Sequence, residues 1–161
     1  MQAICHCPTK LGCLRIVAND RGITQIALVD AKPMQETEVA NQWTQEAVRQ
    51  IREYLDGRRT TFTVPLDPAG TPFQKQVWKA LMEIPYGETR SYRDIAKQVG
   101  NPNACRAVGM ANHRNPILLM IPCHRVIGAS GKLTGYAAGL DKKEYLLRLE
   151  QETRRQTGKP Q

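Results

Sequence analysis

The sequence contains no apolar run that approaches the roughly 20 residues a helix needs to cross a bilayer. It also lacks an internal repeat, a recognisable secretory signal, and the glycine-rich phosphate-binding patterns GxGxxG and GxxxxGK. These absences argue against a membrane protein and against a nucleotide cofactor. We therefore expect a protein with no membrane partner and no cofactor.

Cysteines are few and odd in number, with five in 161 residues. Small secreted proteins held together by disulfides carry even sets of cysteines in shorter chains. The count and the length therefore favour a reducing compartment. We expect a cytoplasmic protein with free thiols.

Acidic residues are outnumbered, with 15 Asp and Glu against 23 Lys and Arg, giving a formal net charge of +8. A basic surface attracts polyanions and gains affinity by releasing their counterions. Nucleic acid is the simplest such partner. A basic protein that is merely soluble has the same composition, so charge leaves both interpretations open.

The first 66 residues have the pattern of a small α+β domain. Two strands are predicted at 14–18 and 23–29, and the polar residues 19–22 between them favour a hairpin turn. Apolar residues recur at helical spacing from 37 to 55. Alternating residues at 61–64 indicate a further strand.

Four potential metal ligands lie near the N-terminus: Cys5, His6, Cys7 and Cys13. Their spacing is not a recognised zinc pattern. A bound zinc ion is one interpretation, and thiols in the core or at a sheet edge are the default. We expect no metal.

Residues 67–70 break the pattern and predict a linker, so that a second domain spans 71–161. Thr71 and Gln74 have the spacing of a capping box, with Pro72 as the first residue of a helix that ends near residue 84. Ser91 and Asp94 form a second capping box, for a short helix that ends at Gly100. A third helix is predicted over 104–112.

The short helix that ends at Gly100 and the helix over 104–112 are joined by a short polar turn, which is typical of a helix-turn-helix. The apolar positions of the third helix are Ala104, Ala107, Val108 and Ala111. Arg106 then points away from the core, with Gly109 close by on the exposed side. An exposed arginine beside a glycine lets a helix approach DNA closely, although an ordinary solvent-facing arginine fits the same pattern.

Beyond residue 125, residues 126–127 and 132–133 flank a small-residue turn and predict a hairpin that would serve as a wing. Residues 134–139 form a loop of small residues that can lie over a flat ligand. Asp141 opens the last predicted helix, whose buried stripe is predicted to contain Tyr145, Leu146 and Leu149.

The feature with the clearest chemical meaning is the run 117–126, in which five apolar residues lead into Pro122, Cys123 and His124. We expect residues 117–121 to form a buried strand or extended segment that ends at the proline. A thiolate is the reactive form of cysteine, and a neighbouring histidine can take the thiol proton. A packed core cysteine beside a structural histidine is the alternative.

Glu150 lies four residues after Leu146, on the apolar face of the last predicted helix. A buried carboxylate is costly without a partner. His124 is the obvious candidate, and the alternative is a glutamate that reaches water at a frayed helix end.

Together these residues resemble a known family. Residues 122–126, Pro-Cys-His-Arg-Val, resemble the active-site signature of the O6-alkylguanine-DNA alkyltransferases, which are self-inactivating DNA repair proteins. Further matches to the family lie at 91–92, 106–109, 115–116, 135–136 and 143–147, and at Glu150. The resemblance is strong over residues 71–150, whereas before residue 67 it rests on length and pattern.

The resemblance implies a ribonuclease-H-like α+β N-terminal domain and a mainly helical C-terminal domain with a winged helix-turn-helix. It implies irreversible, stoichiometric transfer of an alkyl group from O6-alkylguanine in double-stranded DNA to Cys123, with O4-alkylthymine as an alternative donor. His124 would take the thiol proton through a water molecule, Glu150 would hold the imidazole, and Asn115 would brace the active-site turn. The protein would be a monomer in the absence of DNA.

The resemblance also implies substrate contacts. Tyr92 would donate a hydrogen bond to N3 of the leaving guanine and crowd the flanking phosphate, and Arg106 would fill the gap left by the extruded base. The guanine pocket would be lined by Val126, Tyr136, Ala137 and Ala138. We expect the residues that contact DNA to be Tyr92, Arg93, Ala104, Arg106 and Gly109.

Two positions depart from the commonest family pattern. Ala137 and Ala138 stand where glycine or serine is frequent, and their methyl groups could narrow the pocket against bulky O6 substituents. Met110 stands where a smaller residue is common. Two other functions compete with the alkyltransferase: a Cys-His-Glu hydrolase that turns over through a thioester, and a winged-helix DNA binder with an incidental thiol.

Overall fold

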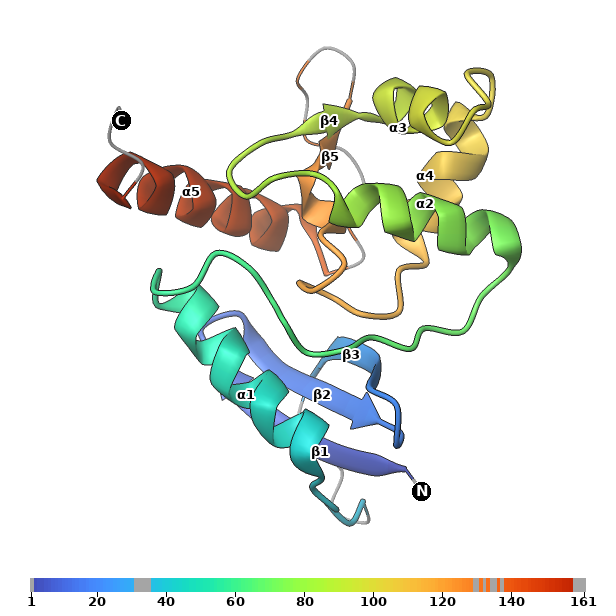
Figure 1. Cartoon of the computed structure of the whole chain (residues 1–161). Helices are drawn as coiled ribbons and strands as arrows, with labels where there is room; N and C mark the ends of the chain where they lie inside the picture. The colour runs from blue at the N-terminus through green and yellow to red at the C-terminus, as the bar shows by residue number, and fades with distance from the viewer. Residues whose placement is uncertain are drawn as a thin grey trace. The chain divides into compact units, whose positions relative to one another are not determined.

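A computed structural model describes residues 2–30, 36–128, 131, 133, 136 and 138–157. The chain forms two compact units (Figure 1). The first consists of Met1–Ala69 together with Pro116–Leu118, and the second of Gly70–Asn115 and Leu119–Gln161. Each unit is described below by itself.

The first unit is built on an antiparallel sheet in the order β1 (Ala3–Thr9), β2 (Gly12–Ala18) and β3 (Ile23–Val29). Helix α1 (Gln42–Leu55) packs on this sheet (Figure 1). The hairpin of β2 and β3 is confirmed. Strand β1 was not predicted, because its residues are mostly half-buried and follow no clean apolar alternation.

Helix α1 begins at residue 42, so the prediction of a helix from residue 37 is wrong. The Asn41 side chain accepts hydrogen bonds from the backbone N–H groups of Trp43 and Thr44, and the Thr44 hydroxyl accepts one from the Asn41 N–H at 3.0 Å. This capping box fixes the first turn. Val39 lies outside the helix, where its backbone pairs with that of Ile4.

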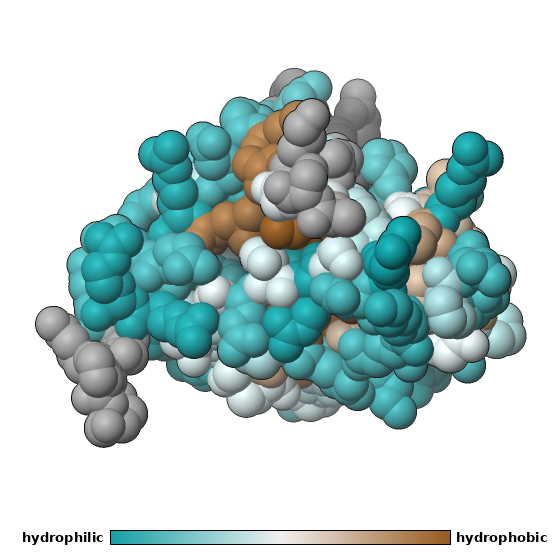
Figure 2. Space-filling view, turned by 90° about the horizontal axis from the view of Figure 1, so that it is seen from above, coloured by the Kyte–Doolittle hydropathy of each residue, from teal (hydrophilic) through white to brown (hydrophobic). Residues whose placement is uncertain are grey.

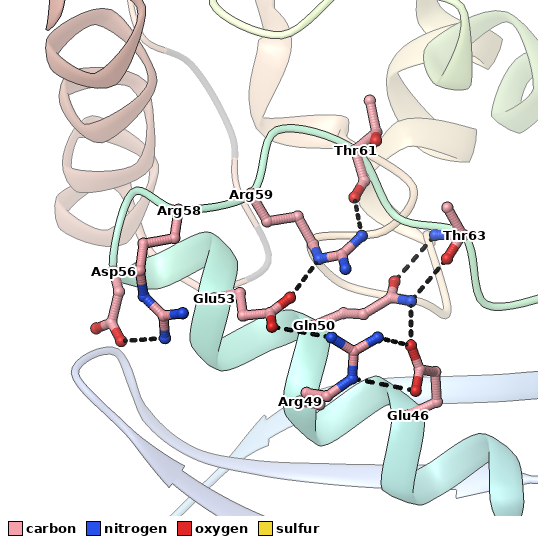
Figure 3. Close-up of polar contacts among 9 residues, drawn as sticks. All are labelled: Glu46, Arg49, Gln50, Glu53, Asp56, Arg58, Arg59, Thr61 and Thr63. Atoms are coloured by element: carbon pink, nitrogen blue, oxygen red, sulfur yellow. Dashed lines mark hydrogen bonds and ion pairs between the residues drawn. The ribbon is translucent and has the colours of Figure 1, made fainter. Parts of the chain in front are cut away.

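Residues 61–64 are not a strand, which corrects a second prediction. The amide of the buried Gln50 side chain takes the place of a neighbouring strand. It accepts a hydrogen bond from the Thr63 N–H at 2.9 Å and donates one to the Thr63 hydroxyl at 2.7 Å (Figure 3). The segment is therefore held against α1 by a side chain.

The apolar run before Pro122 is buried as predicted, but only its first residue is extended. The backbone of Ile26 donates to the Pro116 carbonyl and accepts from the Leu118 N–H, so that Ile117 forms a single parallel bridge with β3. Residues 118–120 then turn, and Leu119 has a φ of 72°. A buried leucine in this left-handed conformation stores backbone strain of about 1–3 kcal/mol shortly before the cysteine.

The second unit opens with α2 (Pro72–Met82), and its predicted capping box is confirmed. The Trp78 indole N–H donates to the Ala111 carbonyl at 2.9 Å, which joins α2 to α4 (Cys105–His113). Between them lie β4 (Arg90–Ser91) and α3 (Tyr92–Gln98), which starts at the second predicted capping box. Helices α3 and α4 form the expected pair of short helices.

The buried face of α4 differs from the predicted one. Val108, Ala111 and Asn112 are buried, whereas Ala107 is exposed. The difference arises because polar Asn112 faces inward, where its amide donates to the Cys123 carbonyl at 3.5 Å.

Strand β5 (Val126–Ile127) pairs in parallel with β4, at Val126 opposite Arg90. Leu133 is not in a strand, so the predicted pairing of 126–127 with 132–133 is not found, and Lys132 lies outside the described residues. The chain then forms α5 (Leu140–Thr157).

Helix α5 buries a different stripe from the one predicted. Lys143, Leu146, Glu150 and Thr153 are buried, whereas Tyr145 is exposed and Leu149 is half-buried. Two of the four buried residues carry formal charges. The apolar pattern alone could not have located this face.

Figure 2 shows one face of the molecule, which is mostly hydrophilic, with a strongly hydrophobic area in its upper middle part and less strongly hydrophobic atoms toward the right. Across the described residues, the exposed large hydrophobic side chains are Val39, Met82, Met110, Leu140 and Tyr145. Within the described part of the chain, no helix combines the length and the apolar character required to span a bilayer.

Candidate active site

Cys123 lies at the start of a short 3₁₀ helix, η1 (Cys123–Arg125), and only 2% of its surface is exposed. Pro122 precedes the helix, so the chain changes direction directly before the thiol. The Asn115 side-chain amide donates to the Cys123 sulfur at 3.1 Å and to the Ile121 carbonyl at 2.7 Å. Asn115 thus braces the turn that carries the cysteine.

Burial raises the pKa of Cys123 to about 11, although the Asn115 hydrogen bond and the charge of Lys143 act in the opposite direction. The resting sulfur is therefore a protonated thiol at neutral pH. Burial therefore keeps Cys123 in the protonated form, which is less nucleophilic than the thiolate. Reaction then requires removal of the proton.

The buried side chains of His124 and Glu150 form a pair, with Nε2 at 2.7 Å from Oε2. A carboxylate accepts and does not donate, so Nε2 carries the imidazole proton in this pair. Burial lowers the pKa of His124, although Glu150 acts to raise it. The predicted pairing is confirmed, and Nδ1 is left as the basic nitrogen of the neutral ring.

Glu150 receives three further donors. The Arg125 guanidinium donates through Nε to Oε1 and through a terminal nitrogen to Oε2, both at 2.9 Å, and the Gly87 N–H donates to Oε1 at 3.1 Å. Burial would raise the pKa of Glu150, but His124 and Arg125 outweigh it and lower the value to about 2. The carboxylate is therefore ionised at all physiological pH values.

Lys143 is also buried in this site, where its ammonium donates to the Val126 carbonyl at 2.5 Å. Burial lowers the pKa of Lys143 to about 8. Tyr136 is buried, and burial together with the charges of Cys123 and Glu150 raises its pKa well above the usual value. These two residues and Val126 thus lie in the surroundings of the thiol.

The helix-turn-helix residues form a second group. The Tyr92 ring lies beside Gly109 of α4, where a Cβ atom would make an ordinary contact with it at 3.9 Å. Arg93 and Arg106 are exposed, and Ala104 is half-buried at the helix start. Ala138 is half-buried, and Ala137 lies outside the described residues.

Four residues that complete the site were not predicted from the sequence: Gly87, Asn112, Arg125 and Lys143. Arg125 stands inside the recognised signature, and its proximity to Glu150 could have been inferred from the cost of burying a charge. Lys143 occupies a helix position three residues before Leu146, and this spacing was an available signal. Nothing in the local pattern indicates Gly87 or Asn112.

The N-terminal cysteines and histidine do not gather into a metal site among the described residues. His6 lies 2.9 Å from a Glu38 oxygen and 3.1 Å from a Glu36 oxygen. Burial raises the pKa of both Cys5 and Cys7. All five cysteines are free.

Comparison with known proteins identifies the family of this chain. Residues 72–152 match the family model described as 6-O-methylguanine DNA methyltransferase, DNA binding domain, and residues 6–68 match the ribonuclease-like domain of the same family. The chain belongs to this family. The methylated-DNA–protein-cysteine methyltransferase of Methanosarcina acetivorans is 51% identical over 148 residues, which cover 88% of this chain and 94% of the relative.

Solved structures of the family agree with the fold. The Mycobacterium tuberculosis O6-methylguanine methyltransferase is 44% identical over 95% of this chain and 94% of its own, with a TM-score of 0.84. The same organism's protein in complex with DNA is 45% identical over 92% of each chain, also with a TM-score of 0.84. The α+β fold class, with a ribonuclease-like domain and a helical DNA-binding domain, is confirmed.

Proposed function

We propose that this protein repairs DNA by moving the alkyl group of O6-alkylguanine onto the sulfur of Cys123, once and irreversibly. The observation that carries this proposal is the buried thiol held by Asn115 at 3.1 Å, followed in sequence by the His124–Glu150 pair. Membership in the family supports the type of reaction, and the arrangement of these side chains supports the role of each residue in it. Residues 71–161 would bind DNA and carry the transfer, joined by residues 67–70 to the domain of residues 1–66.

The transfer is a displacement at carbon. His124 removes the thiol proton through an intervening water, and the sulfur attacks the alkyl carbon attached to guanine O6. A carbon–sulfur bond forms while the carbon–oxygen bond breaks, and the electron pair remains on guanine. A proton donor at the ring, assigned here to Tyr92, stabilises the charge that develops on the leaving base.

The product is a thioether, which ordinary acid–base chemistry at this site does not hydrolyse. The alkylated protein is therefore spent. This distinguishes it from a thioester-forming hydrolase, which would release its acyl group and turn over. A thiol acceptor also requires a reducing compartment, which favours the cytoplasm.

The partner would be double-stranded DNA that bears the lesion, bound by a protein monomer. An alkyl group on O6 within a stacked duplex cannot be approached in line, so the nucleotide must leave the stack at a cost of a few kcal/mol. Arg106 is exposed on α4 and could fill the gap. Val126, Tyr136, Ala137 and Ala138 would then receive the guanine, and Arg93, Ala104 and Gly109 would face the backbone.

The test compares the wild type with Cys123→Ala and Arg106→Ala on two substrates, a methylated duplex and the free base O6-methylguanine. Cys123→Ala should bind DNA and accept no methyl group. Arg106→Ala should lose far more activity on the duplex than on the free base, because only the duplex requires base flipping. Equal losses on both substrates would remove this role from Arg106, and methylation of the Cys123→Ala variant would reject the proposed acceptor.

A further inference from the structure

Every nitrogen of the Arg125 guanidinium is engaged. Nε and one terminal nitrogen bind the two oxygens of Glu150 at 2.9 Å each, and the other terminal nitrogen donates to the Ile84 carbonyl at 2.8 Å. The guanidinium carbon lies 5.5 Å from the centre of the Tyr86 ring. Only 7% of the residue is exposed. Such a forked pair is geometrically specific as well as strong.

This geometry determines the charge beside the catalytic histidine. Glu150 carries one negative charge, and Arg125 supplies the positive charge that balances it within the buried site. A protonated His124 would add a further buried cation, beside Arg125 and the Lys143 ammonium, against a single carboxylate, which is unfavourable in a site of low dielectric constant. The neutral imidazole, with its proton on Nε2, fits the same hydrogen bonds without that excess charge.

We infer that Arg125 is a positioning residue. By neutralising the charge of Glu150, it keeps His124 neutral and able to accept the Cys123 proton. Glu150 then orients the ring without drawing a second proton onto it. A general base must be unprotonated before the reaction begins, so this function bears directly on the transfer rate. The inference deepens the proposed function and rests on it for its catalytic meaning.

Several other titratable or charged groups surround His124 and also affect its protonation. Glu150 and Lys143 face the site from α5, Cys123 and Arg125 belong to η1, and Tyr86 and Tyr136 interact electrostatically with Glu150. Lys143 acts in the same direction as Arg125 on the pKa of His124. Because Lys143 remains when Arg125 is replaced, a change in the variant reports the loss of Arg125.

Two substitutions separate charge from shape. Arg125→Gln removes the positive charge, and Arg125→Lys retains it while losing the fork and the contact with the Ile84 carbonyl. In Arg125→Gln the imidazolium becomes the counter-charge of Glu150, so His124 should become protonated near neutral pH. The rate of transfer by Arg125→Gln, relative to that of the wild type, should then be about tenfold lower at pH 6 than at pH 8.5. A tenfold loss is expected when the pKa of the base lies about one unit above the pH. Arg125→Lys should keep the pH profile of the wild type.

Arg59 offers a matched control in the first unit. Its Nε donates to Glu53 at 2.8 Å and a terminal nitrogen donates to the Thr61 carbonyl at 3.0 Å, which repeats the carboxylate-plus-carbonyl pattern of Arg125 (Figure 3). No histidine belongs to the network drawn there. Arg59→Gln should leave the pH profile of transfer unchanged.

The direct readout is the protonation state of His124 in nitrogen-15 NMR spectra of the intact protein, which contains three histidines. The wild type should show a neutral ring protonated at Nε2 at pH 7, and Arg125→Gln an imidazolium. An imidazolium in the wild type, or identical His124 titration in both proteins, would overturn the inference. If Arg125→Gln fails to fold, an imidazolium in the wild type still overturns the inference, and the His124 titration of Arg125→Lys, compared with the wild type, tests the role of the charge. Since NMR requires no methyl transfer, failure of the proposed function would be recognised separately.

Discussion

The side-chain amide of Asn115 links the sulfur of Cys123, at 3.1 Å, to the carbonyl of Ile121, at 2.7 Å. One nitrogen thus serves both as a brace for the turn and as a hydrogen-bond donor to the reacting atom. A donor aimed at sulfur stabilises the thiolate more than the thiol.

Asn115→Ala should therefore raise the pKa of Cys123 still further and slow methyl transfer by about 10²-fold, because a lost hydrogen bond to a charged group, about 1.5–3 kcal/mol, makes the thiolate harder to form. Single-turnover kinetics, combined with the pH dependence of thiol alkylation by a small reagent, measure both quantities. A variant that transfers at the wild-type rate would show that the contact only braces the turn.

The Glu150 carboxylate makes acid stability testable. Its pKa is lowered from 4.5 to about 2, so its contribution to folding is present above pH 4.5 and is lost as the pH falls toward 2. At about 1.4 kcal/mol per pKa unit, this contribution is about 3 kcal/mol. Glu150→Gln should be less stable than the wild type at pH 7, and its free energy of unfolding should decline less between pH 4.5 and pH 2. Urea denaturation measures both free energies of unfolding, and an equal decline in the two proteins between pH 4.5 and pH 2 would contradict the assigned role.

Gly87 combines two constraints, and Gly100 isolates one of them. Both glycines have a positive φ, 79° at Gly87 and 81° at Gly100. A Cβ atom on Gly87 would lie 2.7 Å from Cδ of Arg154, whereas a Cβ atom on Gly100 would have no neighbouring atom within 4 Å. Gly100→Ala should lose about 1 kcal/mol of stability from strain alone. Gly87→Ala should lose more, because the added methyl group meets the Arg154 side chain, and a backbone shift that relieved this contact would disturb the hydrogen bond from the residue 87 N–H to Glu150. Equal losses in urea denaturation would show that the contact with Arg154 relaxes freely.

Gly109 separates folding from DNA binding. A Cβ there meets only the Tyr92 ring, at an ordinary contact distance of 3.9 Å. Gly109→Ala should therefore fold normally and gain about 0.5–1 kcal/mol of stability from helix propensity. If α4 approaches DNA closely, the added methyl group should weaken duplex binding by about tenfold, or about 1.4 kcal/mol. Unchanged affinity in fluorescence anisotropy would place the DNA backbone farther from this position.

The sequence predicted elements well wherever local chemistry determined them. The capping boxes at Thr71 and Ser91 and the hairpin turn at 19–22 are set by neighbouring residues, and all three are present in the structure. The contact between His124 and Glu150 was also predicted, because a buried carboxylate on an apolar helix face requires a partner.

Predictions failed where a distant polar side chain determined the outcome. Gln50 replaces a strand partner for residues 61–64, and Asn112 turns the face of α4 toward Cys123. Lys143 turns the buried face of α5 toward the Val126 carbonyl. Apolar periodicity carries no information about such contacts, because each depends on a residue more than ten positions away.

The central claim is that one sulfur accepts one alkyl group and keeps it. The most direct test is the intact mass of the protein after incubation with an excess of duplex that carries O6-methylguanine, followed by peptide mapping. The account predicts a gain of a single CH₂ group, located on Cys123, with one lesion repaired per protein molecule. An unmodified Cys123, or repair that continues beyond one lesion per molecule, would contradict it.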